Sequence, residues 1–409
     1  MPVLPELPEI KEAAVRSKDK KAALGPDLDL LQFRRQAQDW SYDEKYASFE
    51  EQEKQHLLRA GIELTDTDHA GTFLQADRSI MHCKTSQPGL EVLPIKEALQ
   101  KYNGLPDYYW RLVPVDADKY TAATELELDN GYFIRALPGA RITQPVEACL
   151  YIRTEGLAQH VHNIVVAEPG SHLHIITGCT THPGVTSGLH LGISEFYVKK
   201  GAHLTFTMVH NWAENVHVRP RSAIIVEEGG VYLSNYIVLK PVKSVQMYPS
   251  VRLVGPGAVA RLNSVVVAHP GSELDLGGRV VLEAPHSRAE VIARTVTTGG
   301  TAIARGHLIG KVPNIKAHLE CRGLILAKQG IMYAVPELTG EVAGVEMSHE
   351  AAVGRIAQEE IEYLMARGLT EEEAASTIVR GFLNVEIEGL PQALKDDIER
   401  TIQETEKGL

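Results

Sequence analysis

Cysteine and aromatic residues are scarce in this sequence. The 409-residue chain has four cysteines, Cys83, Cys149, Cys179 and Cys321, and no two of them have Cys-x-x-Cys spacing. That pattern excludes a disulfide framework and a zinc ribbon, and it predicts a protein of the reducing cytoplasm. Aromatic residues make up 6% of the chain, which suits a structure whose narrow coils are filled by Val, Ile and Ala.

Long apolar runs and an excess of positive charge are also missing. No uncharged apolar stretch approaches the ~18 residues of a membrane-spanning helix, and the N-terminal stretch MPVLPELPEIKEAAVRSKDKKAA lacks the apolar segment of a signal peptide. The net charge of −12 disfavours nucleic acid or an anionic membrane as a partner, because both bind basic surfaces. We therefore expect a soluble cytoplasmic protein with no nucleic-acid and no membrane partner.

Motifs for nucleotide hydrolysis and for nucleophilic catalysis are absent. The sequence has no GxxxxGK[ST] phosphate loop, no GxGxxG after a strand and no GxSxG elbow. We therefore expect that the protein does not hydrolyse ATP itself. A β-helix polysaccharide lyase or hydrolase would need stacking aromatic residues along a groove, and their scarcity argues against that class.

What the sequence does contain is a repeat of about fourteen residues. Short apolar runs alternate with turns that contain Gly or Pro, for example residues 168–170, 199–201, 255–257, 269–271 and 298–300. This period is too short for a strand plus a crossover helix, and it is typical of a solenoid that stacks strand on strand. An antiparallel sandwich is the alternative, but its Asn-Gly hairpin turns are absent. We expect a mainly β protein with a parallel β-helix core.

Helical patterns flank the repeat. On the N-terminal side, we expect a polar helix within residues 30–59 and another over residues 95–102, and strand-like alternation then runs from about residue 121 to 334. On the C-terminal side, apolar spacing predicts three short amphipathic helices, the second opened by the capping box Thr370–Glu373 and the third by Pro391. The expected regions are 1–115, 116–343 and 344–409. The last could close the solenoid or dock another chain.

Two His-x-His pairs are candidate metal ligands. His160 and His162 form one pair, and His172 and His174 the other. Residues i and i+2 of a strand point the same way, so each pair could chelate a metal. His160 and His174 are fourteen residues apart, as are His203 and His217, and we expect stacked coils to place such residues above one another. A cupin-like site of His160, His162 and His174 is thus one alternative, and histidines that bind nothing are the other.

Cys321 is the cysteine with the strongest functional context. It lies in a strand pattern near the end of the repeat, and a buried apolar thiol is the simplest interpretation. The stretch VEMSHEA at residues 345–351 follows, and it brings Glu346, His349 and Glu350 to what the pattern predicts is the join before a helix. Thiolate, imidazole and carboxylate together are ligands for iron or zinc.

Three C-terminal motifs carry a family resemblance. They are VEMSHEAAVGRI at residues 345–356, YLMARGLTEEEA at 363–374 and IVRGF at 378–382. In this order they resemble the C-terminal signature of the SufB/SufD family, the scaffold subunits of the Suf machinery for iron–sulfur cluster assembly. The resemblance covers about residues 90 to 405. It implies a right-handed parallel β-helix between N-terminal and C-terminal helical regions.

The resemblance also implies partners. Two subunits of the family pair through the C-terminal ends of their β-helices; we expect a homodimer here, with pairing to a second homologue as the alternative. Each docks a SufC-type ABC ATPase through its C-terminal helices, so ATP hydrolysis belongs to the partner. A transient iron–sulfur cluster would then pass to apo acceptor proteins.

Matching the motifs residue by residue assigns the site. Cys321 corresponds to the SufB cysteine of nascent cluster assembly, His349 to the interface histidine of SufD, and Glu350 to the carboxylate beside it in SufB. Glu346 is an alternative carboxylate. SufB proteins often carry a second cysteine after Tyr-Pro-Ser, where this chain has Val251, so a sulfur relay through the β-helix interior is in doubt.

Overall fold

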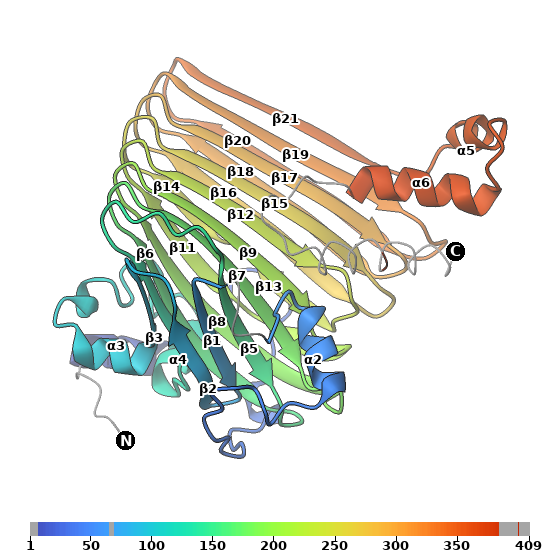
Figure 1. Ribbon diagram of the computed structural model, residues 1–409. Helices are drawn as coiled ribbons and strands as arrows, with labels where there is room; N and C mark the ends of the chain where they lie inside the picture. Colours follow the sequence, from blue (N-terminus) through green and yellow to red (C-terminus); the bar gives the residue numbers. More distant parts are fainter. Residues whose placement is uncertain (1–6, 65–68, 384–399, 401–409) are drawn as a thin grey trace.

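The computed structural model describes residues 7–64, 69–383 and 400. The chain forms a mainly β solenoid of about eight turns with helices at both ends, as the sequence predicts (Figure 1). Two sheets make its walls. Nearly all strand pairs are parallel; β1–β2 and β3–β4 at the N-terminal end are the antiparallel exceptions among the described pairs.

The first sheet has ten strands. In spatial order they are β2 (Ser79–Thr85), β1 (Gly71–Ala76), β5 (Val146–Ile152), β7 (His172–Thr181), β9 (His203–Asn211), β12 (Val231–Val238), β15 (Val259–Ala268), β17 (Arg288–Thr297), β19 (Ile315–Ile325) and β21 (Val345–Gly354).

The second sheet has eleven strands. They are β3 (Leu90–Pro94), β4 (Tyr132–Ala136), β6 (Ala158–Ala167), β8 (Ser187–Val198), β10 (Asn215–Val218), β11 (Arg221–Val226), β13 (Ser244–Met247), β14 (Ser250–Leu253), β16 (Glu273–Leu282), β18 (Thr301–Gly310) and β20 (Ile331–Gly340).

The strand register explains the repeat and corrects one expectation. His172 pairs with His203, 31 residues later, and His203 pairs with Val231, 28 residues later. Each coil therefore contributes one strand or strand pair to each sheet, and the spacing of about fourteen residues is half a coil. The prediction that residues fourteen apart lie above one another is wrong, because they fall on opposite sheets: His160 is in β6 and His174 in β7.

Alternation along each strand divides side chains between the interior and the outer faces. In β18, Ala302, Ala304 and Leu308 are buried in the central core, whereas Ile303, Arg305 and His307, on the other face, are half-buried. Small and β-branched side chains dominate this interior because the two sheets face each other across a narrow space. The strand pattern extends beyond the predicted limits, since β1–β3 precede residue 121 and β21 follows residue 334. Thr121 itself lies in a helix.

The N-terminal region covers both outer faces near the start of the solenoid. Its helices are α1 (Pro8–Ser17), α2 (Glu51–Leu58), α3 (Ile95–Lys101) and α4 (Lys119–Leu126), with 3-10 turns η1 (Leu30–Gln32) and η2 (Leu105–Asp107). The helix predicted over residues 95–102 is confirmed as α3. The helix predicted within residues 30–59 is wrong except for α2 and η1. Residues between them bond to distant strands instead: the Trp40 amide donates to Ser79 and the Asp43 amide to Met81.

Two helices follow the last strand. They are α5 (Gln358–Met365) and α6 (Glu371–Leu383), which confirms two of the three predicted helices. The capping box is formed: the Thr370 amide donates to Glu373 at 2.7 Å, and the Glu373 amide donates to the Thr370 hydroxyl at 3.2 Å. α6 packs on the outer face of the first sheet through Val379 and Leu383. The helix predicted from Pro391 lies outside the described residues.

No helix within the described ranges has both the length and the apolar character that membrane spanning requires.

Candidate functional site

Two strands end the solenoid, and no further described strand pairs with their outer edges. Among the described residues, β20 pairs only with β18, and β21 only with β19. We call the end formed by β20 and β21 the open end (Figure 1). The inner face of β21 carries Val345, Met347, His349, Ala351 and Val353, and their side chains are half-buried or exposed. On the inner face of β19, directly beneath, Ile315, Ala317, Leu319 and Cys321 are buried.

Cys321 lies one strand below the open end. It belongs to β19, its exposed fraction is 0%, and it is part of the central core. In register it lies between Ala293 of β17 and Ala351 of β21, so its neighbours on the inner face are small. Burial raises the pKa of the Cys321 thiol to about 11. While Cys321 stays buried its thiol is therefore protonated. Formation of the thiolate would require either a bound metal ion or exposure of the sulfur to water.

His349 shares the inner face with Cys321. It pairs with Leu319, whereas Cys321 pairs with Ala351, so the two side chains are diagonal neighbours on adjacent strands. Strand spacing puts their Cα atoms on the order of 8 Å apart. The His349 side chain is exposed. Thiol and imidazole thus lie on the same face, one at the open end and the other just beneath it.

Glu346 and Glu350 face the opposite way. Both are on the outer face of β21, where Glu346 lies 2.9 Å from Lys316 Nζ and Glu350 accepts a 2.9 Å hydrogen bond from Arg322 Nη2. The sequence pattern predicted that these carboxylates precede a helix directly. They lie instead in a continuous strand, whose alternation separates them from Cys321. Within a single chain the two carboxylates therefore lie on the face opposite to Cys321 and His349, and the four residues do not form one site.

The His-x-His pairs point to opposite sides of the molecule. His160 and His162 lie on the outer face of the second sheet, where His162 Nε2 is 2.9 Å from Glu195 Oε2 and the ring is stacked on Tyr109. His174 lies on the outer face of the first sheet, 3.4 Å from the Thr207 hydroxyl. Across the described part of the chain, no three His, Cys, Asp or Glu side chains form a group that could hold a metal ion. The geometry thus disfavours the cupin-like alternative.

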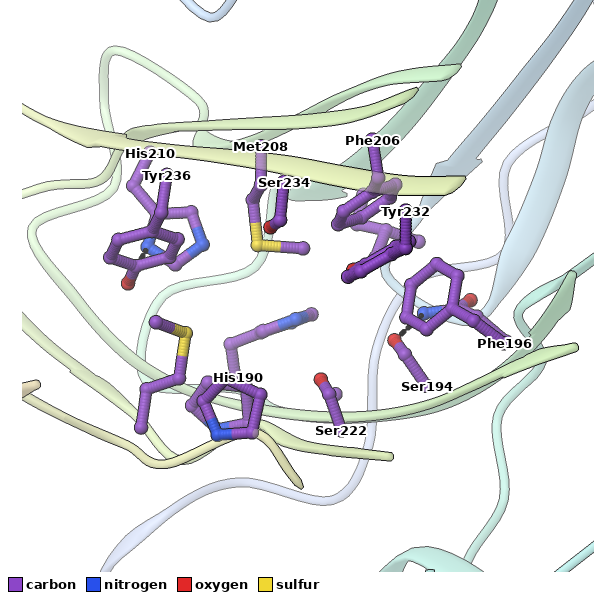
Figure 2. Close-up of a pocket in the computed structure, with 16 residues that line it drawn as sticks. His190, Ser194, Phe196, Phe206, Met208, His210, Ser222, Tyr232, Ser234 and Tyr236 are labelled. Atoms are coloured by element: carbon purple, nitrogen blue, oxygen red, sulfur yellow. Dashed lines mark hydrogen bonds between the residues drawn. The ribbon is translucent and has the colours of Figure 1, made fainter. Parts of the chain in front are cut away.

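Two other histidines line a small interior cavity that the sequence did not reveal. His210, Met208 and Tyr236 point into it from the first sheet, and His190 from the second (Figure 2). Burial lowers the pKa of His190 to about 3 and that of His210 well below its usual value, so both rings are neutral. The volume of about 40 Å³ exceeds the ~10–15 Å³ that one water needs.

The interior column that contains Val251 is aliphatic. Val251 pairs with Ile224 on one side and Val280 on the other, and Leu308 follows. No thiol is present where many SufB proteins carry their second cysteine. Among the described residues, Cys179 lies in the central core and Cys83 packs against it beside Phe73, and burial raises the pKa of both thiols.

Comparisons with known proteins agree with this architecture. The fold and the open end define a β-solenoid with one buried cysteine, Cys321, a strand below its C-terminal end. A family model described as "SUF system FeS cluster assembly, SufBD core domain" matches residues 150–382. The chain therefore belongs to the SufBD family.

Curated relatives extend the match over almost the whole chain. An "Iron-sulfur cluster assembly SufBD family protein" of Archaeoglobus fulgidus is 52% identical over 357 residues, which is 87% of this chain and 96% of that protein. A protein of the same name from Methanothermobacter thermautotrophicus is 47% identical over 402 residues, 97% of this chain and 98% of the relative. A relative from Pyrococcus horikoshii is 30% identical, covering 86% of this chain and 80% of its own length.

Proposed function

We propose that this protein is a cytoplasmic scaffold on which an iron–sulfur cluster is assembled and from which the cluster passes to apo acceptor proteins. It is not an enzyme that turns over a substrate. The observation that carries the proposal is the position of Cys321, on the inner face one strand below the open end and diagonal to His349. One thiolate and one imidazole bind a cluster more weakly than the Cys₄ set of a ferredoxin, and a donor needs such a labile site.

A second copy of the chain would complete the site. β20 and β21 are ten residues each and present unpaired backbone edges within the described structure. Edge strands of this length are usually covered, because they bind other strands. The open end also exposes Tyr333 at 56%, Ile331 at 49% and Val353 at 42%. End-to-end contact of two copies would bury these side chains and bring a second His349 close to Cys321.

In the structure of the single chain, Glu346 and Glu350 form ion pairs and are not near Cys321. Glu350 and Glu346 pair with Arg322 and Lys316 on the outer face, and these pairs fasten β21 to β19. If β21 moves, the pairs break and both carboxylates become available to iron, while Cys321 loses its cover. We therefore propose Cys321, His349 and Glu350 as iron ligands, with Glu346 as the alternative carboxylate.

The C-terminal helices would dock the SufC-type ABC ATPase. α6 packs on the solenoid, but α5 has no buried residue and exposes Tyr363 at 60% and Met365 at 41%. Only residues 355–357 separate β21 from α5. A partner that moves α5 when it binds ATP would pull directly on the strand above Cys321. This is a two-state element controlled from another chain.

Anaerobic reconstitution tests the proposal. Wild type and Cys321→Ala are supplied with ferrous iron and sulfide, desalted, and assayed for iron and acid-labile sulfide. We expect Cys321→Ala to retain almost none and His349→Ala to retain less than wild type. Cys179→Ala, which removes a buried interior thiol, is the matched control and should behave like wild type. Equal retention by Cys321→Ala and wild type would refute the site.

A further inference from the structure

The second sheet is interrupted beside the interior cavity. The pairing of β10 with β13 ends at Val218, and the pairing of β11 with β14 begins at Ala223. Among the described strands, residues 219–222 therefore face residues 246–249 without ladder pairs. Each of these stretches contains a proline, which has no N–H to donate to a ladder. We call this unpaired part of the wall the gap.

The gap forms one wall of the cavity. Strand alternation points Pro220 and Ser222 inward, together with Met247 and Pro249, and all four line the cavity (Figure 2). The described lining holds no carboxylate, lysine or arginine, and its two histidines are neutral. Because the cavity volume is only about 40 Å³, a solute that enters through the gap would have to be small and uncharged.

Two arginines span the gap on its outer side. Arg219 Nη1 donates to the Ser244 hydroxyl at 3.0 Å and to the Ser244 carbonyl at 3.4 Å on the neighbouring strand. Arg221 Nη1 donates to the Gln246 carbonyl of the same strand at 3.3 Å. Arg221 is itself held at 2.8 Å by Asp118, whose side chain caps α4. Side-chain hydrogen bonds thus join the two strands where the backbone ladder is interrupted.

Arg219 depends on every hydrogen bond that it makes. Its exposed fraction is 0%, burial lowers its pKa, and no described carboxylate forms an ion pair with it. A buried guanidinium without a counter-charge destabilises the folded state unless hydrogen bonds compensate for its lost hydration. One of these bonds comes from outside the solenoid wall, because Nη2 donates to the Pro26 carbonyl at 3.3 Å. The segment that carries Pro26 therefore stabilises Arg219 in its place across the gap.

This segment, residues 18–29, has neither helix nor strand and connects α1 to η1. We call it the strap. Gly25 lies directly against the gap: its φ is +76°, and a Cβ atom added to it would lie 2.5 Å from Gln246 Cγ. Gly25 and Pro26 are exposed, so few buried contacts hold this part of the strap. Segments of this kind open at a low cost in free energy.

We propose that the strap is a lid over a side entrance to the solenoid interior, and that Arg219 couples the strap to the gap. With the strap in place, Arg219 and Arg221 hold the two strands together. When the strap lifts, Arg219 loses the Pro26 carbonyl, water reaches its guanidinium, and the gap opens the cavity to small uncharged solutes. The inference goes beyond the proposed function and does not depend on Cys321 or on the open end.

A cysteine placed in the cavity wall would report this opening. Ser222→Cys replaces a cavity-lining side chain, and its alkylation by iodoacetamide in the full-length protein is followed by peptide mass spectrometry. Alkylation of a buried thiol follows the population of the open form when opening and closing are fast. Adding Gly25→Ala should raise the rate about fivefold or more, because a left-handed φ strains alanine and the methyl group pushes the strap away from Gln246. Adding Arg219→Gln should raise the rate as well.

Gly257→Ala is the matched control for the backbone strain. Gly257 has a φ of +72°, close to that of Gly25, but a Cβ atom added there would meet nothing within 4 Å. Combined with Ser222→Cys, it should change the alkylation rate by less than about twofold. Cys321 is the internal reference in every sample, and its own alkylation rate should stay the same.

The other outcomes contradict the lid. Equal rates with Gly25→Ala and Gly257→Ala would overturn the inference. So would an Ser222→Cys thiol that reacts without further substitution as fast as in the denatured chain, because the gap would then be open already. Equal acceleration of Cys321 would indicate general loosening and also overturn it, and no effect of Arg219→Gln would refute the coupling. Iron retention by Cys321→Ala is a separate measurement, so the scaffold proposal can fail or hold independently.

Discussion

The two ends of the solenoid are built differently although they use the same repeat. At the N-terminal end, β2 and β3 run antiparallel to their neighbours, and inner-face residues such as Phe73 and Tyr132 are at most 1% exposed. At the open end, β20 and β21 continue the parallel pattern to the last coil, and the inner face of β21 stays accessible. A solenoid needs a cap to be stable alone. The described residues hold no cap at the C-terminal end, which is why we propose that another chain binds there.

The largest expected effect is a difference in the free energy of unfolding that equivalent substitutions cost at the two ends. Phe73→Ala should lower the free energy of unfolding by about 3–5 kcal/mol, because it leaves a cavity in the capped interior. Val353→Ala, at a side chain that is 42% exposed, should cost about 0.5 kcal/mol or less. Urea unfolding followed by circular dichroism measures both. Similar costs would mean that the two ends are packed alike.

Acid should weaken the interior. Burial lowers the pKa of His190 to about 3, below the ~6.5 of an unfolded chain. The neutral ring therefore stabilises the folded state fully above pH 6.5, and this contribution is lost as the pH falls toward 3. Between pH 7 and 4.5 the loss is about 2–3 kcal/mol. His190→Gln should show a smaller loss over this range in urea unfolding at both pH values; an unchanged pH dependence would contradict the assignment.

Charge at the open end should disrupt self-association. Val353→Asp places a carboxylate where the second copy would pack, and we expect the dimer dissociation constant to rise on the order of tenfold or more. Leu31→Asp is the control, since Leu31 is 81% exposed in the N-terminal region. Sedimentation velocity over a concentration series measures both. If the two variants associate equally well, the open end is not the dimer interface.

The smallest expected effect concerns access to the thiol. Cys321 and Cys179 both have exposed fractions of 0%, but only Cys321 lies beneath an edge strand. Arg322→Ala removes the pair with Glu350, which at 42% and 53% exposure contributes about 0.2–1 kcal/mol. Alkylation of Cys321, read by peptide mass spectrometry, should then speed up by about two- to fivefold while Cys179 is unchanged.

An ion pair elsewhere on the same sheet provides a control for the loss of one positive charge. Arg261 pairs with Glu290 at 2.7 Å on the same sheet, away from β21. Arg261→Ala should leave the alkylation of Cys321 as in wild type. If it accelerates Cys321 as much as Arg322→Ala does, the pairs on β21 are not what fastens that strand.

Much of the fold could be predicted because it repeats locally. Gly and Pro turns at regular spacing predicted the solenoid, and helical spacing predicted α3, α5 and α6. Predictions failed where contacts between residues far apart in the sequence determine the local structure. Residues 34–50 have a polar, helix-like composition, yet their amides bond to strands more than thirty residues away, as Trp40 does to Ser79. The stretch 345–354 reads as a loop before a helix, but β19 offers it an edge to pair with.

For the candidate site, too, part could be predicted from local sequence and part depends on distant contacts. The sequence named Cys321 and His349 as candidates through the resemblance of the C-terminal motifs, and the structure places both on one inner face; their role stays a prediction. Glu346 and Glu350 carry the expected chemistry but face outward, and only the pairing of β21 with β19 decides that.

The amino-acid sequence alone determined the period, the alternation within each strand, the terminal helices and the family, since these depend on residues close together in the chain. Tertiary structure decided which side chains face the interior, because strands in contact are 28 to 31 residues apart and their register sets the phase of every alternation. It also decided that no described strand caps the C-terminal end, because capping depends on where the chain reverses its direction and not on the repeat itself.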